Sequence, residues 1–539
     1  MAALILAVSV FIFVLAYRFY GDRIARLLKV DRNLPTPAHT MYDGIDYCPA
    51  KKAVLFGHHF ASIAGAAPIV GPIIAASFGW FPVILWVVLG SVFIGAVHDY
   101  TVLIASARHK GRSVGEVIGV HVGALSRRIF LIFLWLTLIL LISAFIILVA
   151  QAFISSPQAA TSSIFFIAIA VLFGLSVYRW RAPVWLSSLI GVILLFICVV
   201  LGWYFPISLR FEVWCVLLLL YVFVASVTPV WILLQPRDYL NSFILYAVVV
   251  LSIVGMFAAH PDIKLPLFAS WHMPDVGFIF PVLFVTVACG AVSGFHSVVA
   301  SGTTAKQLDN EGDAKMVGYG AMLVEGLVAV LALLFAAMLT KDEYKGLSSN
   351  PIDVFANGAG FVMSKLGLNA NKARSFATLS VSAFILTSVD TATRLARFAF
   401  QEFFAPKASE TASILNRNRY IGTLVTVAAS AALAFSNKWR VIWPLFGSAN
   451  QLLAALALLA VSVWLKKTGR RGIYTLIPMV FMLAVTISSL INIITRSTRS
   501  GNVSLVVIAS ALLIMAFVIV FEAVSVFKNR SGASSGDLV

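Results

Sequence analysis

The sequence contains few charged residues. Only 11% of its 539 residues are Asp, Glu, Lys or Arg, whereas 61% are hydrophobic. Soluble domains carry about 25% charged residues and about half apolar ones, so a soluble globular protein is excluded. The apolar residues form runs of about 20, the length that a helix needs to cross a ~30 Å hydrocarbon layer. The sequence therefore predicts an all-α polytopic membrane protein.

Cysteine is also scarce, and two common motifs are missing. Cys48, Cys198, Cys215 and Cys289 form no CxxC or CxxCH pair, so neither a disulfide framework nor a zinc–thiolate site is expected. The GxxxxGK[ST] phosphate loop is absent too, which leaves no ATP site of that kind. Transport would then be driven by an ion gradient or by the gradient of the substrate. No enzymatic activity is expected.

Fifteen apolar segments are predicted to cross the membrane. They are residues 2–20, 55–78, 80–105, 129–154, 161–178, 183–205, 212–234, 241–260, 278–302, 316–340, 375–393, 419–436, 441–465, 473–495 and 502–526. We divide the chain into an N-terminal helix with a cytoplasmic loop (1–54), a core (55–465), and a C-terminal pair of helices with a cytoplasmic tail (466–539).

The basic residues predict the orientation. With the N-terminus outside, 27 of the 39 Lys and Arg residues fall in cytoplasmic segments and 11 in external loops. Cytoplasmic loops collect Lys and Arg, so we predict an external N-terminus and a cytoplasmic C-terminus. The net charge of +17 comes from Lys and Arg in the loops between the apolar segments. No nucleic-acid partner is therefore expected.

Helix breakers gather at the middle of the second segment, FGHHFASIAGAAPIVGP (56–72). Gly65, Ala66, Pro68 and Gly71 lie near its midpoint, where proline removes a backbone donor. A break at that depth is tolerated only against protein or a wet cavity, and such helices build sites in secondary transporters. We predict a substrate site at these four residues. The alternative is a proline kink with small residues for close packing.

Histidines from three segments fall at one predicted depth, toward the cytoplasm. They are His58 and His59, His98 with the adjacent Asp99, and His296. Histidine titrates near neutral pH, which favours proton coupling. The same residue types bind divalent metals, and two histidines hold a b-type haem. Buried, neutral histidines with a structural role are the remaining alternative.

Other polar residues lie at the ends of apolar segments. The stretch 226–241 contains Pro229 and Pro236 and predicts either a second broken helix or a gate. Its candidate residues are Ser226 and Thr228 for substrate and Gln235, Arg237 and Asp238 for gating.

Two further helices carry candidate residues. Asp390 and Arg394 are spaced i, i+4 on one helix face and predict a gating pair. Asn450 and Gln451 are candidate substrate ligands, although buried amides also hold helices together. Glu325 and Glu522 are lone acids within apolar segments and are alternative proton carriers.

A short Gly-x-His motif occurs in both the second and the ninth segment. Gly57-x-His59-x5-Gly65 matches Gly294-x-His296-x5-Gly302. The two segments are seven apart and antiparallel, which is compatible with a seven-plus-seven inverted repeat, with chance or with a shared packing need.

Several longer motifs resemble the carbon starvation protein A (CstA) family. They are GHHFASIAGAAPIVGP, GAVHDYTVLIASARHKGRSVGE, LLQPRDYLN, ACGAVSGFHSVVASGTTAKQ, DTATRLARFAFQEF and WPLFGSANQLLA. The resemblance implies a transporter of the bacterial inner membrane, with relatives associated with uptake of peptides and of pyruvate with protons.

The resemblance also implies a fold. The family is similar to the amino acid–polyamine–organocation transporters, which have a LeuT-type five-plus-five inverted repeat. The second and seventh segments would then be the broken helices. The ninth would bring His59, Ser297 and Ser301 near Gly65 and Pro68 at a cation site.

We therefore expect a secondary transporter that takes up a peptide or pyruvate together with a proton or another monovalent cation. No cofactor is required for this function. The alternative is a membrane protein that binds a divalent metal or a b-type haem at His58, His59, His98, Asp99 and His296.

Overall fold

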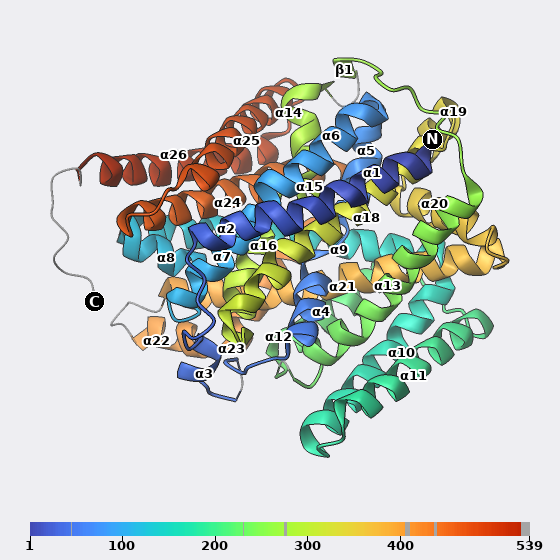
Figure 1. Cartoon of the computed structure of the whole chain (residues 1–539), viewed down its shortest axis with the longest axis horizontal. Coiled ribbons are helices and arrows are strands. Elements are labelled where there is room, and N and C mark those ends of the chain that lie inside the picture. Colours follow the sequence, from blue (N-terminus) through green and yellow to red (C-terminus); the bar gives the residue numbers. More distant parts are fainter. Residues whose placement is uncertain (45, 230, 274–276, 405–409, 436–438, 530–539) are drawn as a thin grey trace.

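The computed structural model of the protein is almost entirely helical (Figure 1). It describes residues 1–529 except 45, 230, 274–276, 405–409 and 436–438. Residues 530–539, the end of the predicted cytoplasmic tail, lie outside this range. Within it, the strands are β1 (His272–Met273) and β2 (Gly277–Phe278), an antiparallel pair in which His272 faces Phe278.

Eleven helices within the described part of the chain are long and apolar enough to cross a membrane. They are Ala2–Leu27 (α1 to α2), Trp80–Arg108 (α6 to α7), Ala124–Ser155 (α9), Pro157–Val177 (α10), Val184–Tyr204 (α11), Leu234–Ala259 (α13), Glu311–Ala337 (ending in α18), Ala370–Phe404 (α21), Ile442–Lys467 (in α24), Ile473–Arg499 (α25) and Val503–Val526 (in α26). A bent pair, Lys52–Ile63 (α4) and Ala67–Phe78 (beginning with α5), adds a twelfth.

The remaining predicted segments are helical but not long helices. Phe211–Val227 (α12) and Arg419–Ala434 (α23) are shorter apolar helices. The ninth segment is divided into Ile279–Thr286 (α14), Ala288–Ala291 (α15) and Gly294–Val299 (α16), which continues through the π-helical turn Ala300–Thr304. The polytopic helical class is confirmed, whereas fifteen crossings remain a prediction.

The predicted break in the second segment is present. α4 ends at Ile63 and the axis bends by 46° before α5 begins at Ala67. Pro68 lies in the first turn of α5, where its missing N–H removes no helical hydrogen bond. The hydroxyl of Ser388 on α21 donates to the carbonyl of Ser62 at 3.1 Å, so protein contacts satisfy a carbonyl next to the break.

The second broken helix is the ninth segment, and the expectation that it would be the seventh is wrong. α12 ends at Val227, the chain is extended at Thr228, and the next helix, α13, begins at Leu234. Pro236 lies in the first turn of α13, a position that proline tolerates. Gln235, Arg237 and Asp238 therefore belong to the start of α13.

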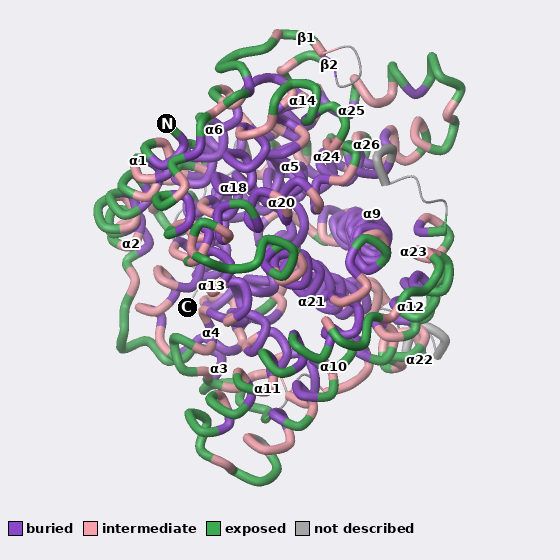
Figure 2. The backbone as a smooth tube through the Cα atoms, turned by 90° about the vertical axis from the view of Figure 1, so that its right-hand side faces the viewer, coloured by how far each residue is buried: buried purple, intermediate pink, exposed green. Residues whose placement is uncertain are grey.

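Helices at the centre of the bundle are buried along their middle turns (Figure 2). The most apolar windows of α21 and α24 are 100% buried, against 22% for α26 and 28% for α11. The α10–α11 hairpin lies at the periphery in both views. The central helices are therefore the ones that can enclose polar residues away from lipid.

The two ends of the bundle differ. The N-terminus and Lys341–Leu347 (α19) lie at one end, and Pro37–Thr40 (α3), Val114–His121 (α8) and Glu410–Arg417 (α22) lie at the other (Figure 1). The segment Pro351–Ser364 (α20) follows α19. The end with α3 and α8 is the one predicted to face the cytoplasm.

A histidine pair fixes α8 at that end. The Nε2 atoms of His109 and His121 are 2.8 Å apart, so only one of them carries the shared proton when both rings are neutral. Burial, with smaller contributions from His109 and Lys467, lowers the pKa of His121 from 6.5 to about 4. Burial also lowers the pKa of His109.

We expect the folded protein to lose stability as the pH falls from about 6.5 to about 4. Over this range the unfolded chain binds a proton at His121 that the folded chain excludes, so protons favour unfolding. The apparent Tm of purified protein should fall less steeply with pH in His121→Gln than in the wild type. His272→Gln, at an exposed site, is the control. An equal slope in His121→Gln and wild type would contradict the prediction.

Candidate functional site

The two broken helices touch next to their breaks. A Cβ atom at Gly71 of α5 would lie 2.5 Å from the carbonyl oxygen of Thr286, the last residue of α14. A Cβ at Gly290 of α15 would lie 3.5 Å from the Cα of Pro68. Glycine at position 71 therefore permits a close approach that no side chain allows. The predicted residues Gly65, Ala66, Pro68 and Gly71 lie in or beside this junction.

Asn450 of α24 caps the start of α16, next to the second break. Its Oδ1 accepts a hydrogen bond from the backbone N–H of Phe295 at 2.8 Å, and its Nδ2 donates to Ser293 Oγ at 3.0 Å. The side chain thus satisfies a donor in the first turn of α16, which has no partner within the helix. Gln451 donates to the carbonyl of Phe284 on α14 at 2.5 Å. Both amides bind the backbone of the broken helix.

Ser226 and Thr228, also predicted to contact substrate, lie elsewhere. They are at the end of α12, where the Ser226 hydroxyl is 3.2 Å from that of Thr423 on α23. The carbonyl of Ser226 accepts from Arg397, and that of Thr228 from Arg394. These contacts join α12 to α21 and α23, and they involve neither broken helix.

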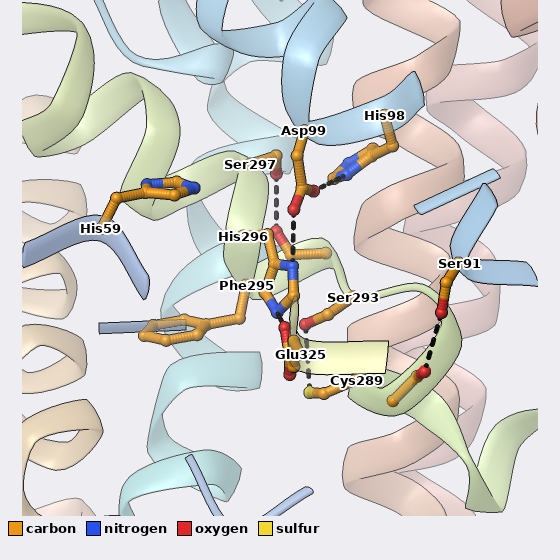
Figure 3. Close-up of polar contacts among 12 residues, drawn as sticks. His59, Ser91, His98, Asp99, Cys289, Ser293, Phe295, His296, Ser297 and Glu325 are labelled. Carbon is orange, nitrogen blue, oxygen red and sulfur yellow. Dashed lines mark hydrogen bonds and ion pairs between the residues drawn. The ribbon is translucent and has the colours of Figure 1, made fainter. Parts of the chain in front are cut away.

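Four titratable side chains form a continuous buried network (Figure 3). His98 Nδ1 is 2.8 Å from Asp99 Oδ1, Asp99 Oδ2 is 2.8 Å from His296 Nδ1, and His296 Nε2 is 3.2 Å from Glu325 Oε2. All four side chains have 0% exposure. We call these residues the histidine–carboxylate network. It joins α7 (Ala96–Arg108), α16 and α18 (Ala321–Ala337).

Three residues of the network belong to the predicted histidine layer, and the fourth, Glu325, does not. The predicted layer of His98, Asp99 and His296 is brought together in space. The sequence predicts Glu325 only as a lone acid, because nothing in the spacing of α18 links it to a histidine. A carboxylate in an apolar helix is a functional candidate by itself. This is the sequence signal that points to Glu325.

His58 and His59 point to different partners. His58 Nδ1 is 3.1 Å from Asp238 of α13, and His59 Nδ1 is 2.8 Å from the hydroxyl of Thr304. The Nε2 atom of His59 has no hydrogen-bond partner among the described residues, and Figure 3 shows its ring directed toward the network. The five predicted coupling groups thus separate into one cluster of three and two flanking histidines.

Ser297 and Ser301 bond mainly to backbone atoms. The Ser297 hydroxyl donates to the carbonyl of Gly294 at 2.6 Å, and that of Ser301 to the carbonyl of Ser297 at 2.7 Å. Ser301 Oγ also accepts from the N–H of Val114 at 3.3 Å. Ser301 therefore ties the second broken helix to the start of α8.

Asp390 pairs with Arg237 of α13, and the predicted Asp390–Arg394 pair is wrong. Arg237 also donates to the hydroxyl of Tyr221 at 2.6 Å, and that hydroxyl donates to Asp390 at 2.7 Å. The side chains of Arg237 and Asp390 are 3% and 0% exposed. Arg394 instead donates to the carbonyls of Ala225 and Thr228. Gln235 donates to Gln307 at 3.0 Å.

The predicted metal ligands do not converge. Among the residues that the structure describes, no three His, Cys, Asp or Glu side chains have an arrangement that could hold a metal ion. His98 and His296 both turn Nδ1 toward Asp99, while His58 and His59 face Asp238 and Thr304.

The Gly-x-His motif lies on different sides of the two breaks. In the second segment Gly57 and His59 precede the break at 64–66, whereas Gly294 and His296 follow the break at 292–293. Two equivalent halves of an inverted repeat would place the motif on the same side of both breaks. The Gly-x-His motif therefore does not support a seven-plus-seven repeat.

Comparisons with known proteins agree with the motifs. The profile of the family described as carbon starvation protein CstA matches residues 1–353 and 346–489. The peptide transporter CstA of Campylobacter jejuni is 34% identical over 561 residues, covering 90% of this chain and 79% of the relative. The pyruvate/proton symporter BtsT of Escherichia coli is 33% identical over 576 residues, covering 89% and 80%.

Solved structures are similar as well, and we give one of them. This example is the manganese transporter of Eremococcus coleocola in complex with an aromatic bis-isothiourea substituted compound, with a TM-score of 0.48 and 12% identity over 90% of this chain and 99% of the other. The sequence comparisons, which cover most of the protein, establish that this polytopic membrane protein belongs to the carbon starvation protein CstA family.

Proposed function

We propose that the protein is a secondary transporter of the bacterial cytoplasmic membrane that couples uptake of a short peptide or of pyruvate to proton entry. The observation that carries this proposal is the histidine–carboxylate network, with four fully buried titratable groups in contact across three helices. Intramembrane ionisable residues are costly and commonly form proton relays. The names of the two relatives support the same substrates and the same coupling ion.

Hydrogen-bond chemistry supports one position for the coupling proton. An ionised carboxylate only accepts hydrogen bonds, so an ionised Asp99 requires a proton on the Nδ1 atoms of both His98 and His296. His296 Nε2 then faces Glu325 Oε2 at 3.2 Å, and neither atom has a hydrogen-bond partner among the described residues. A single proton bound between these two groups reduces the negative charge of the network from −2 to −1. We assign the coupling proton to the His296–Glu325 pair.

The proton site is part of the broken helix. His296 lies on α16 three residues after Ser293, where Asn450 caps the break. A change in charge at His296 therefore acts on a half-helix held at its start by side-chain hydrogen bonds. Half-helices of this kind form the substrate and ion sites around which secondary transporters alternate their access.

We also propose the five-plus-five repeat, with its halves shifted from the expected segments. The first would contain α4–α5, α6–α7, α9, α12 and α13, and the second α14–α16, α18, α21, α23 and α24. Both begin with a broken helix, and the predicted topology gives equivalent helices opposite directions. The peripheral α10–α11 hairpin is then an insertion, and α25–α26 follow the core. The basic-residue count supports an external N-terminus.

Uptake by proteoliposomes tests the function. We expect labelled dialanine or pyruvate to accumulate when the outside is acidic, and accumulation to be lost with a protonophore. Empty liposomes and a gradient of reversed sign are the controls. Uptake that is the same with and without the gradient would reject proton coupling, and no uptake of any compound in a panel of peptides and keto acids would reject the substrate class.

A further inference from the structure

A polar pocket lies at the predicted cytoplasmic end, apart from the histidine–carboxylate network. Its volume is about 360 Å³, at the small end of the range for ligand pockets. It lies between the start of α8, the last turns of the second broken helix and the end of α21. Tyr47 from the loop before α4 forms another wall.

Two cations line the pocket, Arg112 and Lys306, and Lys306 has no carboxylate partner among the described residues. Lys306 Nζ lies 5.3 Å from the ring centroids of both Tyr47 and Phe398. No carboxylate among the described residues is within 4.0 Å of it, unlike Lys315, which pairs with Asp22. Two aromatic faces orient the ammonium group but leave its hydrogen-bond donors for another acceptor.

Another wall carries a carboxylate. Glu402 of α21 accepts a hydrogen bond from Ser113 Oγ at 2.9 Å, and no cation among the described residues forms an ion pair with it. Glu116, also in the lining, is paired with Arg127. Glu402 therefore has acceptor capacity that its protein contacts do not use.

The pocket and the proposed proton site have one helix in common. Val298 and Gly302 of the lining belong to the same broken helix as His296, two and six residues further along. Movement of this half-helix would thus alter both the His296–Glu325 pair and the shape of the pocket.

We propose that this pocket binds a short zwitterionic peptide on its way to the cytoplasm, with Lys306 binding the peptide carboxylate and Glu402 its ammonium group. The inference rests on the proposed transport function and narrows its substrate to peptides. A keto acid such as pyruvate has only the negative group and would use half of the site. Each charge-assisted hydrogen bond contributes about 1.5–3 kcal/mol, which corresponds to roughly tenfold or more in affinity.

Calorimetric titration of purified full-length protein tests the site with four probes: dialanine, N-acetyl-dialanine, dialanine amide and pyruvate. In the wild type, dialanine should bind roughly tenfold or more tightly than either blocked peptide. Glu402→Gln, which keeps an oxygen for Ser113, should weaken dialanine to the level of N-acetyl-dialanine and leave N-acetyl-dialanine unchanged. Lys306→Met should weaken dialanine and N-acetyl-dialanine, but not dialanine amide. Lys345→Met, at an exposed position on α19, is the matched control.

Unchanged dialanine affinity in both variants, or equal wild-type affinity for free and blocked peptides, would overturn the proposal. The unchanged affinity for the blocked probes shows that each variant is folded. If the predicted pattern is found but proteoliposomes show no gradient-driven uptake, the transport proposal fails and the site stands. If uptake is gradient-driven but the variants bind dialanine normally, the site fails and the transport proposal stands.

Discussion

Glu325→Gln is expected to abolish proton-driven accumulation while leaving exchange of labelled for unlabelled substrate across the membrane. Glutamine cannot share the proton with His296 Nε2, which lies 3.2 Å from Glu325 in the wild type. A gradient of two pH units supplies ~2.7 kcal/mol per proton, enough for about 100-fold accumulation with one proton per substrate. We expect this ratio to fall to about one. The measurement compares uptake against a gradient with counterflow in the same proteoliposomes.

Glu522→Gln is the matched control for this result. Glu522 is the other acid within an apolar segment that the sequence offers as a proton carrier. It accepts hydrogen bonds from the backbone and hydroxyl of Ser126, and no hydrogen bond or ion pair joins it to a histidine among the described residues. We expect it to keep gradient-driven uptake. Retained accumulation in Glu325→Gln, or equal losses in both variants, would reject the assignment of the coupling proton to the His296–Glu325 pair.

Arg237→Met is expected to cause the largest loss of stability. It leaves Asp390 buried, 0% exposed, with the hydroxyl of Tyr221 as its remaining hydrogen-bond donor. Removing one member of a buried ion pair costs about 3–5 kcal/mol, because the other charge is left unpaired. We expect a low yield of monodisperse protein and a much lower apparent Tm in detergent.

The double variant Arg237→Met/Asp390→Leu separates the cost of an unpaired charge from a need for the pair itself. It removes both charges and keeps similar volumes, so we expect much of the yield and apparent Tm to return. No recovery would contradict the explanation by an unpaired charge. If the double variant is stable but does not transport, the pair has the gating role predicted for Arg237 and Asp390.

The sequence was sufficient to locate the first break and the histidine layer. Both signals are local: Pro68 and its neighbouring glycines interrupt one apolar segment, and the depth of each histidine follows from its distance to the next basic residue. Depth, however, gives no lateral position. His58 and His59 are adjacent in sequence, yet only the structure shows that they face Asp238 and Thr304.

The second break was missed because its cause is distant in the sequence. Residues 288–294 contain glycine but no proline, and Val292 favours extended backbone only weakly. The break is held by Asn450, 155 residues further on. In the same way, helical spacing predicted Asp390 with Arg394, but the tertiary partner Arg237 prevailed. Spacing along one helix cannot reveal a partner on another.

The buried pairs also impose an order on synthesis. Asp99 and His296 are 197 residues apart in the sequence, and Arg237 and Asp390 are 153 apart. At about 5–20 residues per second, translation separates the appearance of such partners by roughly 10–40 s. During that interval Asp99 has the neighbouring His98, but not His296, as a hydrogen-bond partner. The final placement of α7 in the bilayer therefore waits for the second half of the chain, so a ribosome stalled before residue 296 leaves a nascent protein with its central carboxylate only half paired.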